Sequence, residues 1–154
     1  MDADGQHPAA ELRRLLELVR SGQMDVAVGS RFVSGPGYRA YRYRPAGIRR
    51  LGTALLRRSM RIALGRPFND ATSGLYAASA SALPVLARRY TSGAPEVQAI
   101  LRLHEEGLRV QEVPVDMRAR SGGESKLRGR KAFLLVLTVI GTLAGARRLW
   151  RRGA

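Results

Sequence analysis

Apolar residues recur at helical spacing near the start of the chain, between residues 8 and 20. They occupy positions i, i+3, i+4 and i+7 of one helix face: Leu12, Leu15, Leu16 and Val19. Pro8 suits the first turn of such a helix, where a missing N–H has no intrahelical partner to lose. Gly22 is placed to end the helix. We therefore predict a helix over Pro8–Arg20.

Three later segments are also predicted to be helical. Residues 48–64 carry apolar residues at helical spacing (Ile48, Leu51, Leu55 and Ile62), surrounded by five arginines at positions 49, 50, 57, 58 and 61. Residues 79–89 form a second candidate, in which Pro84 kinks the helix or marks its start. Residues 95–106 form the third, and Gly107 is expected to end it.

Short apolar runs between turn residues predict three strands. Residues 25–30 (DVAVGS) are typical of a buried strand, and Leu75–Ala78 follows a turn-rich stretch. Residues 108–118 (LRVQEVPVDMR) form the third, which Pro114 restricts to a sheet edge or a bulge. Strands that alternate with helices indicate an α/β fold with parallel strands. Ser34–Pro45, punctuated by glycine and proline, is predicted to be a loop or a lid.

The end of the chain has a different character. Ala132–Ala146 is an uncharged apolar run, and basic residues lie on both sides of it. As a helix it would be roughly 22 Å long, whereas the hydrocarbon core of a bilayer is about 30 Å thick. A shallow membrane helix with snorkelling arginines and an ordinary packing helix both fit this run.

The charge of the chain predicts an anionic partner. Lys and Arg number 27 against 12 Asp and Glu, which gives a formal net charge of +15. Nucleic acid, a membrane surface and phosphorylated substrates are all compatible with this excess. The stretch YRAYRYRP alternates aromatic residues with arginine, as in grooves that bind single-stranded nucleic acid. The chain has no cysteine, which excludes disulfides, thiolate metal sites and cysteine nucleophiles.

Two carboxylates lie two residues apart at Asp2 and Asp4. In an extended segment such side chains share one face, and carboxylate pairs hold Mg²⁺ beside substrate phosphates. An EF-hand loop does not fit, because Gly5 falls at loop position four instead of position six, and Arg13 occupies position twelve, where that loop needs glutamate. Helix capping before Pro8 remains an alternative for these carboxylates.

Several motifs occur in a fixed order: DADGQHP, VGSRF, a loop rich in tyrosine and arginine, DATSGLY, EGLRVQEVPV and RSGGESKL. In this order they resemble the inverting family 2 glycosyltransferases of the dolichyl-phosphate mannosyltransferase type. The resemblance covers residues 1–127. It implies part of a Rossmann-like α/β sandwich of the GT-A type with a truncated, mostly parallel sheet. Residues 128–154 would then form a basic-flanked apolar helical tail associated with the membrane.

The resemblance also implies roles for individual residues. Asp2 and Asp4, supported by Gln6, correspond to the ligands of Mg²⁺ or Mn²⁺. Asp70 corresponds to the acidic catalytic residue on the acceptor side. The substrate-binding positions are Arg31, which approaches the phosphate, Ser73 in the following turn, and the diphosphate clamp of Arg120, Ser125 and Lys126.

Each of these assignments has a structural alternative. Arg31 is otherwise one more surface arginine, and Asp70 is otherwise a turn or N-cap residue. The basic residues of RSGGESKL would otherwise belong to a membrane-facing surface.

The implied reaction transfers a sugar from a nucleotide sugar, of the GDP-mannose or UDP-glucose type, to a polyprenyl phosphate. A metal ion and cationic side chains would stabilise the leaving diphosphate. A phosphate monoester has a second pKa of about 6, so the acceptor needs little help from a general base. The expected location is the cytoplasmic face of the membrane, on an anionic lipid surface, with no nucleic acid bound.

Members of this family begin with a nucleotide-binding half that contains an Asp-Asp-x-Ser-x-Asp type of motif. No such motif precedes DADGQHP here, so the resemblance implies that the chain corresponds to the later portion of the domain. We accordingly expect a truncated form whose own activity is in doubt. The alternative is a noncatalytic basic module that binds membranes or nucleic acid.

Overall fold

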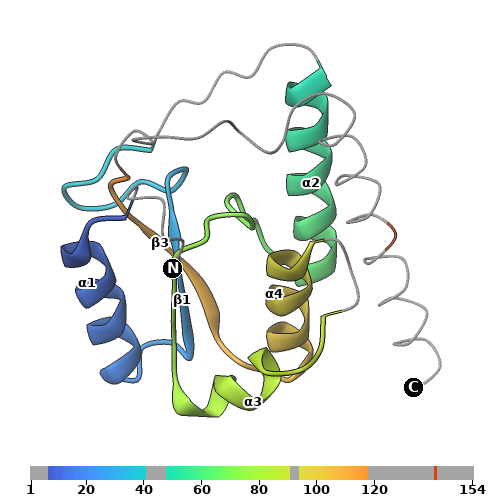
Figure 1. The fold of residues 1–154 in the computed structure, drawn as a ribbon. Coiled ribbons are helices and arrows are strands. Elements are labelled where there is room, and N and C mark those ends of the chain that lie inside the picture. Colours follow the sequence, from blue (N-terminus) through green and yellow to red (C-terminus); the bar gives the residue numbers. More distant parts are fainter. Residues whose placement is uncertain (1–6, 41–47, 91–93, 118–140, 142–154) are drawn as a thin grey trace.

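A three-stranded sheet lies at the centre of the computed structural model, which describes residues 7–40, 48–90, 94–117 and 141 (Figure 1). In sheet order the strands are β2 (Tyr76–Ala78), β1 (Val26–Ser30) and β3 (Val110–Pro114). β1 and β3 run parallel, so that Ser30 lies opposite Pro114 at their carboxyl ends. β2 runs antiparallel to β1. The α/β class is therefore confirmed, and each predicted strand is present.

The expectation of a mostly parallel sheet is only partly correct. Among the described strands, one pair is parallel and the other is antiparallel. The reason is where the chain arrives before β2. Asp70 is held beside Arg31, at the carboxyl end of β1. A strand that starts from this end can pair with β1 only by running in the opposite direction.

Helices cover both faces of the sheet, with α1 on one side and α2 and α4 on the other (Figure 1). The helices are α1 (Ala9–Arg20), α2 (Ile48–Leu64), α3 (Leu83–Leu86) and α4 (Pro95–Glu105), with a 3₁₀ turn at Ala80–Ala82. α1, α2 and α4 confirm the predicted helices. Gly22 and Gly107 follow α1 and α4 with φ angles of 72° and 73°, which glycine adopts without strain.

Alternate residues of the central strand supply the two layers of the core. On one face Ala27 packs with Leu15 and Val19 of α1. On the other face Val26 and Val28 pack with residues of α2 and α4, including Met60 and Ile100. All five residues of β1 are buried, which explains its nearly continuous apolar sequence.

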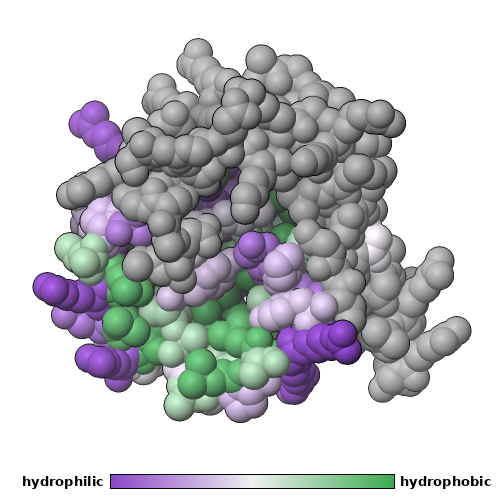
Figure 2. Space-filling view, in the orientation of Figure 1, coloured by the Kyte–Doolittle hydropathy of each residue, from purple (hydrophilic) through white to green (hydrophobic). Residues whose placement is uncertain are grey.

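The helix predicted over Ser79–Arg89 is shorter than expected. A 3₁₀ turn at Ala80–Ala82 leads into α3, which contains only four residues, Leu83–Leu86. Pro84 lies in the first turn of α3, where its missing N–H costs no hydrogen bond. Pro84 thus marks a helix start, one of its two predicted roles. Figure 2 shows apolar residues over α1 and α3 on the visible face, and Leu83 of α3 is 56% exposed.

Pro114 ends β3 at the edge of the described sheet, as predicted from its missing N–H. Its ring packs against the turn at Gly35, where an added Cβ would lie 2.7 Å from Pro114 Cγ. Only glycine fits such a close approach. Gly35 also forms an isolated bridge with Tyr38, so the predicted loop is ordered at its start.

The predicted C-terminal helix lies outside the described residues, apart from Gly141. Among the helices that the structure describes, none is both long and apolar enough to cross a bilayer.

An ion pair holds the parallel strands in register at their starts. Asp25 Oδ2 accepts hydrogen bonds from Arg109 N at 2.8 Å and Arg109 Nε at 3.1 Å, and Asp25 Oδ1 accepts one from Arg109 Nη2 at 3.0 Å. The side-chain and backbone N–H groups of Arg109 hold the pKa of Asp25 below its ordinary value. Folding therefore favours the ionised form of Asp25 over its protonated form.

We predict that Asp25 contributes a pH-dependent part of the stability. Because its pKa is lower in the folded chain, its contribution is present above the unfolded pKa of about 3.9 and disappears as the pH falls through the folded value. Asp25→Asn should lower the free energy of unfolding at neutral pH and flatten its decline in acid. Urea unfolding at a series of pH values measures both effects. Glu105→Gln, at an exposed position, is the control, and an equal acid response in Asp25→Asn and wild type would contradict the prediction.

Candidate functional site

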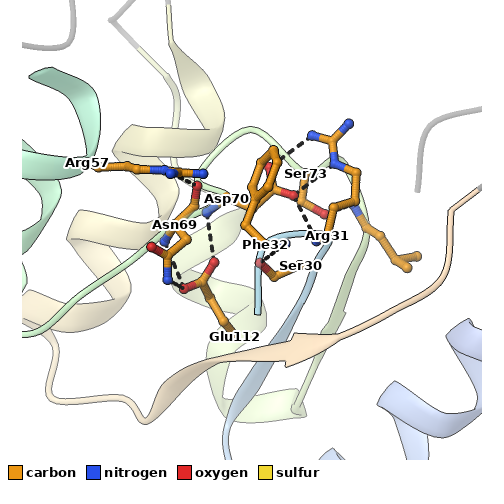
Figure 3. A network of polar contacts seen from close by, with 9 residues as sticks. Ser30, Arg31, Phe32, Arg57, Asn69, Asp70, Ser73 and Glu112 are labelled. Atoms are coloured by element: carbon orange, nitrogen blue, oxygen red, sulfur yellow. Dashed lines mark hydrogen bonds and ion pairs between the residues drawn. The ribbon is translucent and has the colours of Figure 1, made fainter. Parts of the chain in front are cut away.

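The candidate site lies where the carboxyl ends of β1 and β3 meet the turn that precedes β2 (Figure 3). Ser30 ends β1 and is followed directly by Arg31 and Phe32, the turn contributes residues 69–73, and β3 contributes Glu112. In open α/β sheets, ligands bind outside the carboxyl ends of parallel strands. The position of this cluster is therefore that of a binding site.

Arg31 and Asp70 form a bidentate ion pair at the centre of the site. Arg31 Nε donates to Asp70 Oδ2 and Arg31 Nη2 donates to Asp70 Oδ1, each at 3.0 Å. The backbone N–H of Arg31 also donates to Asp70 Oδ2, at 3.1 Å. The carboxylate of Asp70 is 1% exposed and the side chain of Arg31 is 32% exposed. Arg31 is thus not simply a surface arginine, and the Asp70 carboxylate holds β1 rather than capping its own turn.

Glu112 holds the turn that carries Asp70. Its Oε2 atom accepts hydrogen bonds from the backbone N–H of Asn69 at 2.8 Å and from Asn69 Nδ2 at 3.1 Å. Its Oε1 atom accepts one from the backbone N–H of Asp70 at 2.7 Å. Sequence reasoning assigned Glu112 no role. The available signal was an acidic residue in the middle of a strand, between Gln111 and Val113.

Ser73 shapes the rest of the turn. Its buried hydroxyl oxygen accepts a hydrogen bond from the backbone N–H of Leu75 at 3.3 Å. Gly74 between them has a φ of 72°, a conformation that glycine supplies at low cost. Ser73 and Gly74 therefore form the turn that the motif implies, and substrate binding by Ser73 remains a prediction.

Arg57 connects α2 to the same turn. Its Nε atom donates to the backbone carbonyl of Asn69 at 3.3 Å. The guanidinium carbon of Arg57 lies 4.7 Å from the ring centre of Phe32, and that of Arg31 lies 5.3 Å from it. Both distances are within the range of cation–π attraction. The Asp70 turn is therefore held from β3 by Glu112 and from α2 by Arg57.

A second cluster fixes the start of the loop that follows β1. Glu11 of α1 is buried, and its carboxylate accepts hydrogen bonds from the Tyr38 hydroxyl at 3.1 and 3.3 Å and from Arg14 Nη2 at 3.0 Å. Arg14 lies over the Tyr38 ring at 4.4 Å and also donates to the carbonyl of Pro114. Burial, and then the bond to Glu11, raise the pKa of Tyr38. This cluster, which sequence reasoning missed, attaches the loop to α1 and to the end of β3.

The remaining predicted site residues lie outside the described part of the chain. They are the proposed metal ligands Asp2, Asp4 and Gln6 and the proposed diphosphate clamp of Arg120, Ser125 and Lys126. Within residues 7–40, 48–90 and 94–117, no group of three or more His, Asp or Glu side chains could hold a metal ion. The described site is therefore the Arg31–Asp70 pair and the residues that support it.

The chain is similar to curated polyprenyl-phosphate mannosyltransferases over most of its length. It is 31% identical over 132 residues to the polyprenol monophosphomannose synthase of Mycolicibacterium smegmatis, covering 84% of this chain and 48% of that protein. It is 35% identical over 134 residues to the undecaprenyl-phosphate mannosyltransferase of Micrococcus luteus, covering 84% and 52%. It is 32% identical over 141 residues to the dolichol-phosphate mannosyltransferase of Pyrococcus furiosus, covering 86% and 36%.

These matches confirm the resemblance that the ordered motifs indicate. The chain spans about half the length of the first two relatives and about a third of the other. No family model and no solved structure matches it.

We predict an asymmetric loss of stability when the Arg31–Asp70 pair is broken. Arg31→Ala leaves a buried carboxylate without its counter-ion, so the free energy of unfolding should fall by about 2–4 kcal/mol. Arg31→Ala combined with Asp70→Ala should cost less than the sum of the two single changes, because no buried charge is left unpaired. Arg88→Ala, which breaks the exposed pair with Glu106, is the control and should cost about 0–1 kcal/mol. Chemical unfolding measures all four variants, and additive effects at Arg31 and Asp70 would contradict the prediction.

Proposed function

We propose that this chain, a relative of the polyprenyl-phosphate mannosyltransferases, forms the acceptor-side part of a glycosyltransferase. The reaction transfers a sugar, with inversion, from a nucleotide sugar of the GDP-mannose or UDP-glucose type to a polyprenyl phosphate. The observation that carries this proposal is the similarity to three such enzymes over five-sixths of the chain. The Arg31–Asp70 pair, at the carboxyl edge of the sheet, supports it.

Arg31 is the described residue that we assign to phosphate. A guanidinium in a bidentate pair is held in one orientation, and about a third of its side chain remains exposed. An anionic phosphate approaching the carboxyl edge of the sheet would therefore meet a cation that is already oriented. Preorganised charge of this kind stabilises anions without further ordering of the protein.

Asp70 positions Arg31 in this proposal instead of acting as the acidic catalytic residue that the resemblance implies. Both of its oxygens accept hydrogen bonds from Arg31, and the carboxylate is 1% exposed. The acceptor phosphate also has little need of a base, because its second pKa is about 6. We therefore assign the attack to the ionised acceptor itself, with the sugar carbon as its target.

The nucleotide diphosphate is assigned to residues outside the described part of the chain. Asp2, Asp4 and Gln6 offer two carboxylates and an amide oxygen, which is a donor set that suits Mg²⁺ or Mn²⁺. When bound, such an ion supplies positive charge to the departing diphosphate. Arg120, Ser125 and Lys126 would contact the same diphosphate and share its charge.

A membrane surface is the proposed setting of the reaction. Leu51, Leu55 and Ile62 of α2 are 70%, 38% and 50% exposed, and Arg58 and Arg61 beside them are also exposed. An apolar stripe with basic flanks suits the headgroup region of an anionic leaflet. We propose that α2 and the basic-flanked tail lie on the cytoplasmic face of the membrane, where a lipid phosphate is presented.

A transfer assay tests the proposed function and the metal ligands together. We expect a chimera, in which the 154-residue chain replaces the matching region of the Micrococcus luteus enzyme, to transfer mannose from GDP-mannose to undecaprenyl phosphate in the presence of a divalent ion. Asp2→Asn or Asp4→Asn should lower this transfer by about 100-fold or more, because each removes a charged ligand. Glu17→Gln, an exposed acid-to-amide change on α1, is the control. Normal turnover in both aspartate variants would instead support helix capping, which asparagine also provides.

Binding to vesicles tests the membrane setting. We expect the chain to bind vesicles rich in anionic lipid, because each basic residue near such a surface contributes about 1 kcal/mol. Leu51→Ser with Ile62→Ser should weaken binding about tenfold or more, and salt should weaken it further. Leu83→Ser, on the exposed surface of α3, is the matched control and should have no effect. Deleting the residues after Arg130 should release protein that in the full-length form stays in the membrane fraction. A full-length chain that does not bind these vesicles would contradict the proposed membrane setting.

A further inference from the structure

The turn that carries Asp70 is held by a residue that, among the described contacts, forms no hydrogen bond with the side chain of Arg31 or Asp70. Within the part of the chain that the structure describes, Glu112 on β3 accepts hydrogen bonds from the backbone N–H and side-chain amide of Asn69 and from the backbone N–H of Asp70. We propose that Glu112 is a positioning residue: it holds the Asn69–Asp70 turn in the conformation in which Asp70 pairs with Arg31. Its effect on sugar transfer rests on the proposed function, whereas its effect on the pair does not.

The contacts of Glu112 are selective for one turn conformation. Its two carboxylate oxygens bind the backbone N–H groups of consecutive residues, at 2.8 and 2.7 Å. Successive backbone N–H groups point to the same side only in particular turns, where they form a concave site for an anion. Hydrogen bonds to an ionised acceptor are roughly twice as strong as neutral ones. Glu112 therefore stabilises this turn over the other conformations of the same segment.

The peptide of Asp70 transmits this effect to Arg31. Its backbone N–H faces Glu112, while its side-chain carboxylate faces Arg31 (Figure 3). If the turn rotates away from Glu112, the carboxylate rotates with it and the two parallel bonds to the guanidinium no longer align. Each of the two carboxylates accepts three hydrogen bonds, which compensates its negative charge.

Glu112→Gln is the informative substitution because it keeps the shape of the side chain. One carboxylate oxygen becomes an NH₂ group, which would point a donor at the donor N–H of Asn69 or Asp70. Glu112→Asp keeps the charge and both oxygens but is one methylene shorter, so it should restore the contacts in part. Gln111→Ala, at the preceding, exposed position of β3, is the matched control.

Hydrogen exchange measured by NMR in the 154-residue chain tests the proposal directly. The signal of Arg31 Nε–H, identified by its loss in Arg31→Lys, reports on the pair. The amide of Asp70 reports on the turn. In Glu112→Gln we expect both to exchange about tenfold faster or more, with a smaller increase in Glu112→Asp and none in Gln111→Ala. Unchanged exchange of Arg31 Nε–H in a folded Glu112→Gln chain would overturn the proposal.

Asn69→Ala keeps the test decisive if Glu112→Gln does not fold. It removes only the contact of 3.1 Å between Asn69 Nδ2 and Glu112 and leaves the carboxylate in place. We expect exchange of Arg31 Nε–H to rise about two- to fivefold in this variant. No change there would also overturn the role of Glu112.

The transfer assay supplies a second readout in the same chimera. Because Glu112 acts through Arg31, Glu112→Gln should lower kcat/KM for undecaprenyl phosphate about 10- to 100-fold and leave the KM for GDP-mannose unchanged. An equal rise in the KM of both substrates would indicate general destabilisation and contradict a positioning role. If the unsubstituted chimera shows no transfer, the proposed function fails, and the exchange of Arg31 Nε–H still decides on Glu112.

Discussion

The buried carboxylate of Asp70 is the constraint on which the rest of the site depends. Removing an ionised carboxylate from water costs several kcal/mol unless a counter-ion and hydrogen bonds compensate. Arg31 supplies both, with two side-chain bonds and one backbone bond to a group that is 1% exposed. The turn before β2 must therefore stay at the carboxyl end of β1. This requirement also sets the antiparallel direction of β2, so one ion pair links the geometry of the site to the topology of the sheet.

Polar contacts join β1 and β3 at both ends of their parallel pairing. Asp25 and Arg109 join the starts of the two strands, and the turn held by Glu112 joins their carboxyl ends through Arg31. The cluster of Glu11 and Tyr38 then attaches the following loop to α1. The end of β1, the turn before β2 and the end of β3 thus meet at the carboxyl edge of the sheet. Charged groups, and not apolar packing alone, fix how these three segments are oriented there.

Local patterns were sufficient to predict the elements but not their arrangement. The bounds of α1, α2 and α4 were predicted closely, because α1 and α2 each bury one face, whereas α4 lies between Pro95 and the turn at Gly107. The direction of β2 was missed, since it depends on an ion pair between residues 39 positions apart. The motifs named Arg31 and Asp70 separately and did not indicate that they pair. Glu112 and Tyr38 were missed for the same reason, because their partners lie 42 and 27 positions away.

The two faces of α2 connect the proposed membrane surface to the site. Positions 57, 60 and 64 follow the i, i+3, i+7 spacing of one face, on which Met60 and Leu64 are buried in the core. Leu51, Leu55 and Ile62 lie on the opposite, exposed face. Arg57 extends from the inner face to the carbonyl of Asn69 and to the ring of Phe32.

A helix that rests on lipid through its outer face would therefore hold the Asp70 turn through its inner face. In this arrangement Arg31 lies one residue from a ring that α2 contacts directly. The position of Arg31, the residue that we propose to bind phosphate, would then be set relative to the membrane by packed side chains, without a flexible linker between them. An acceptor whose phosphate sits at headgroup depth requires such a fixed distance, because its apolar chain cannot leave the bilayer to reach a distant site.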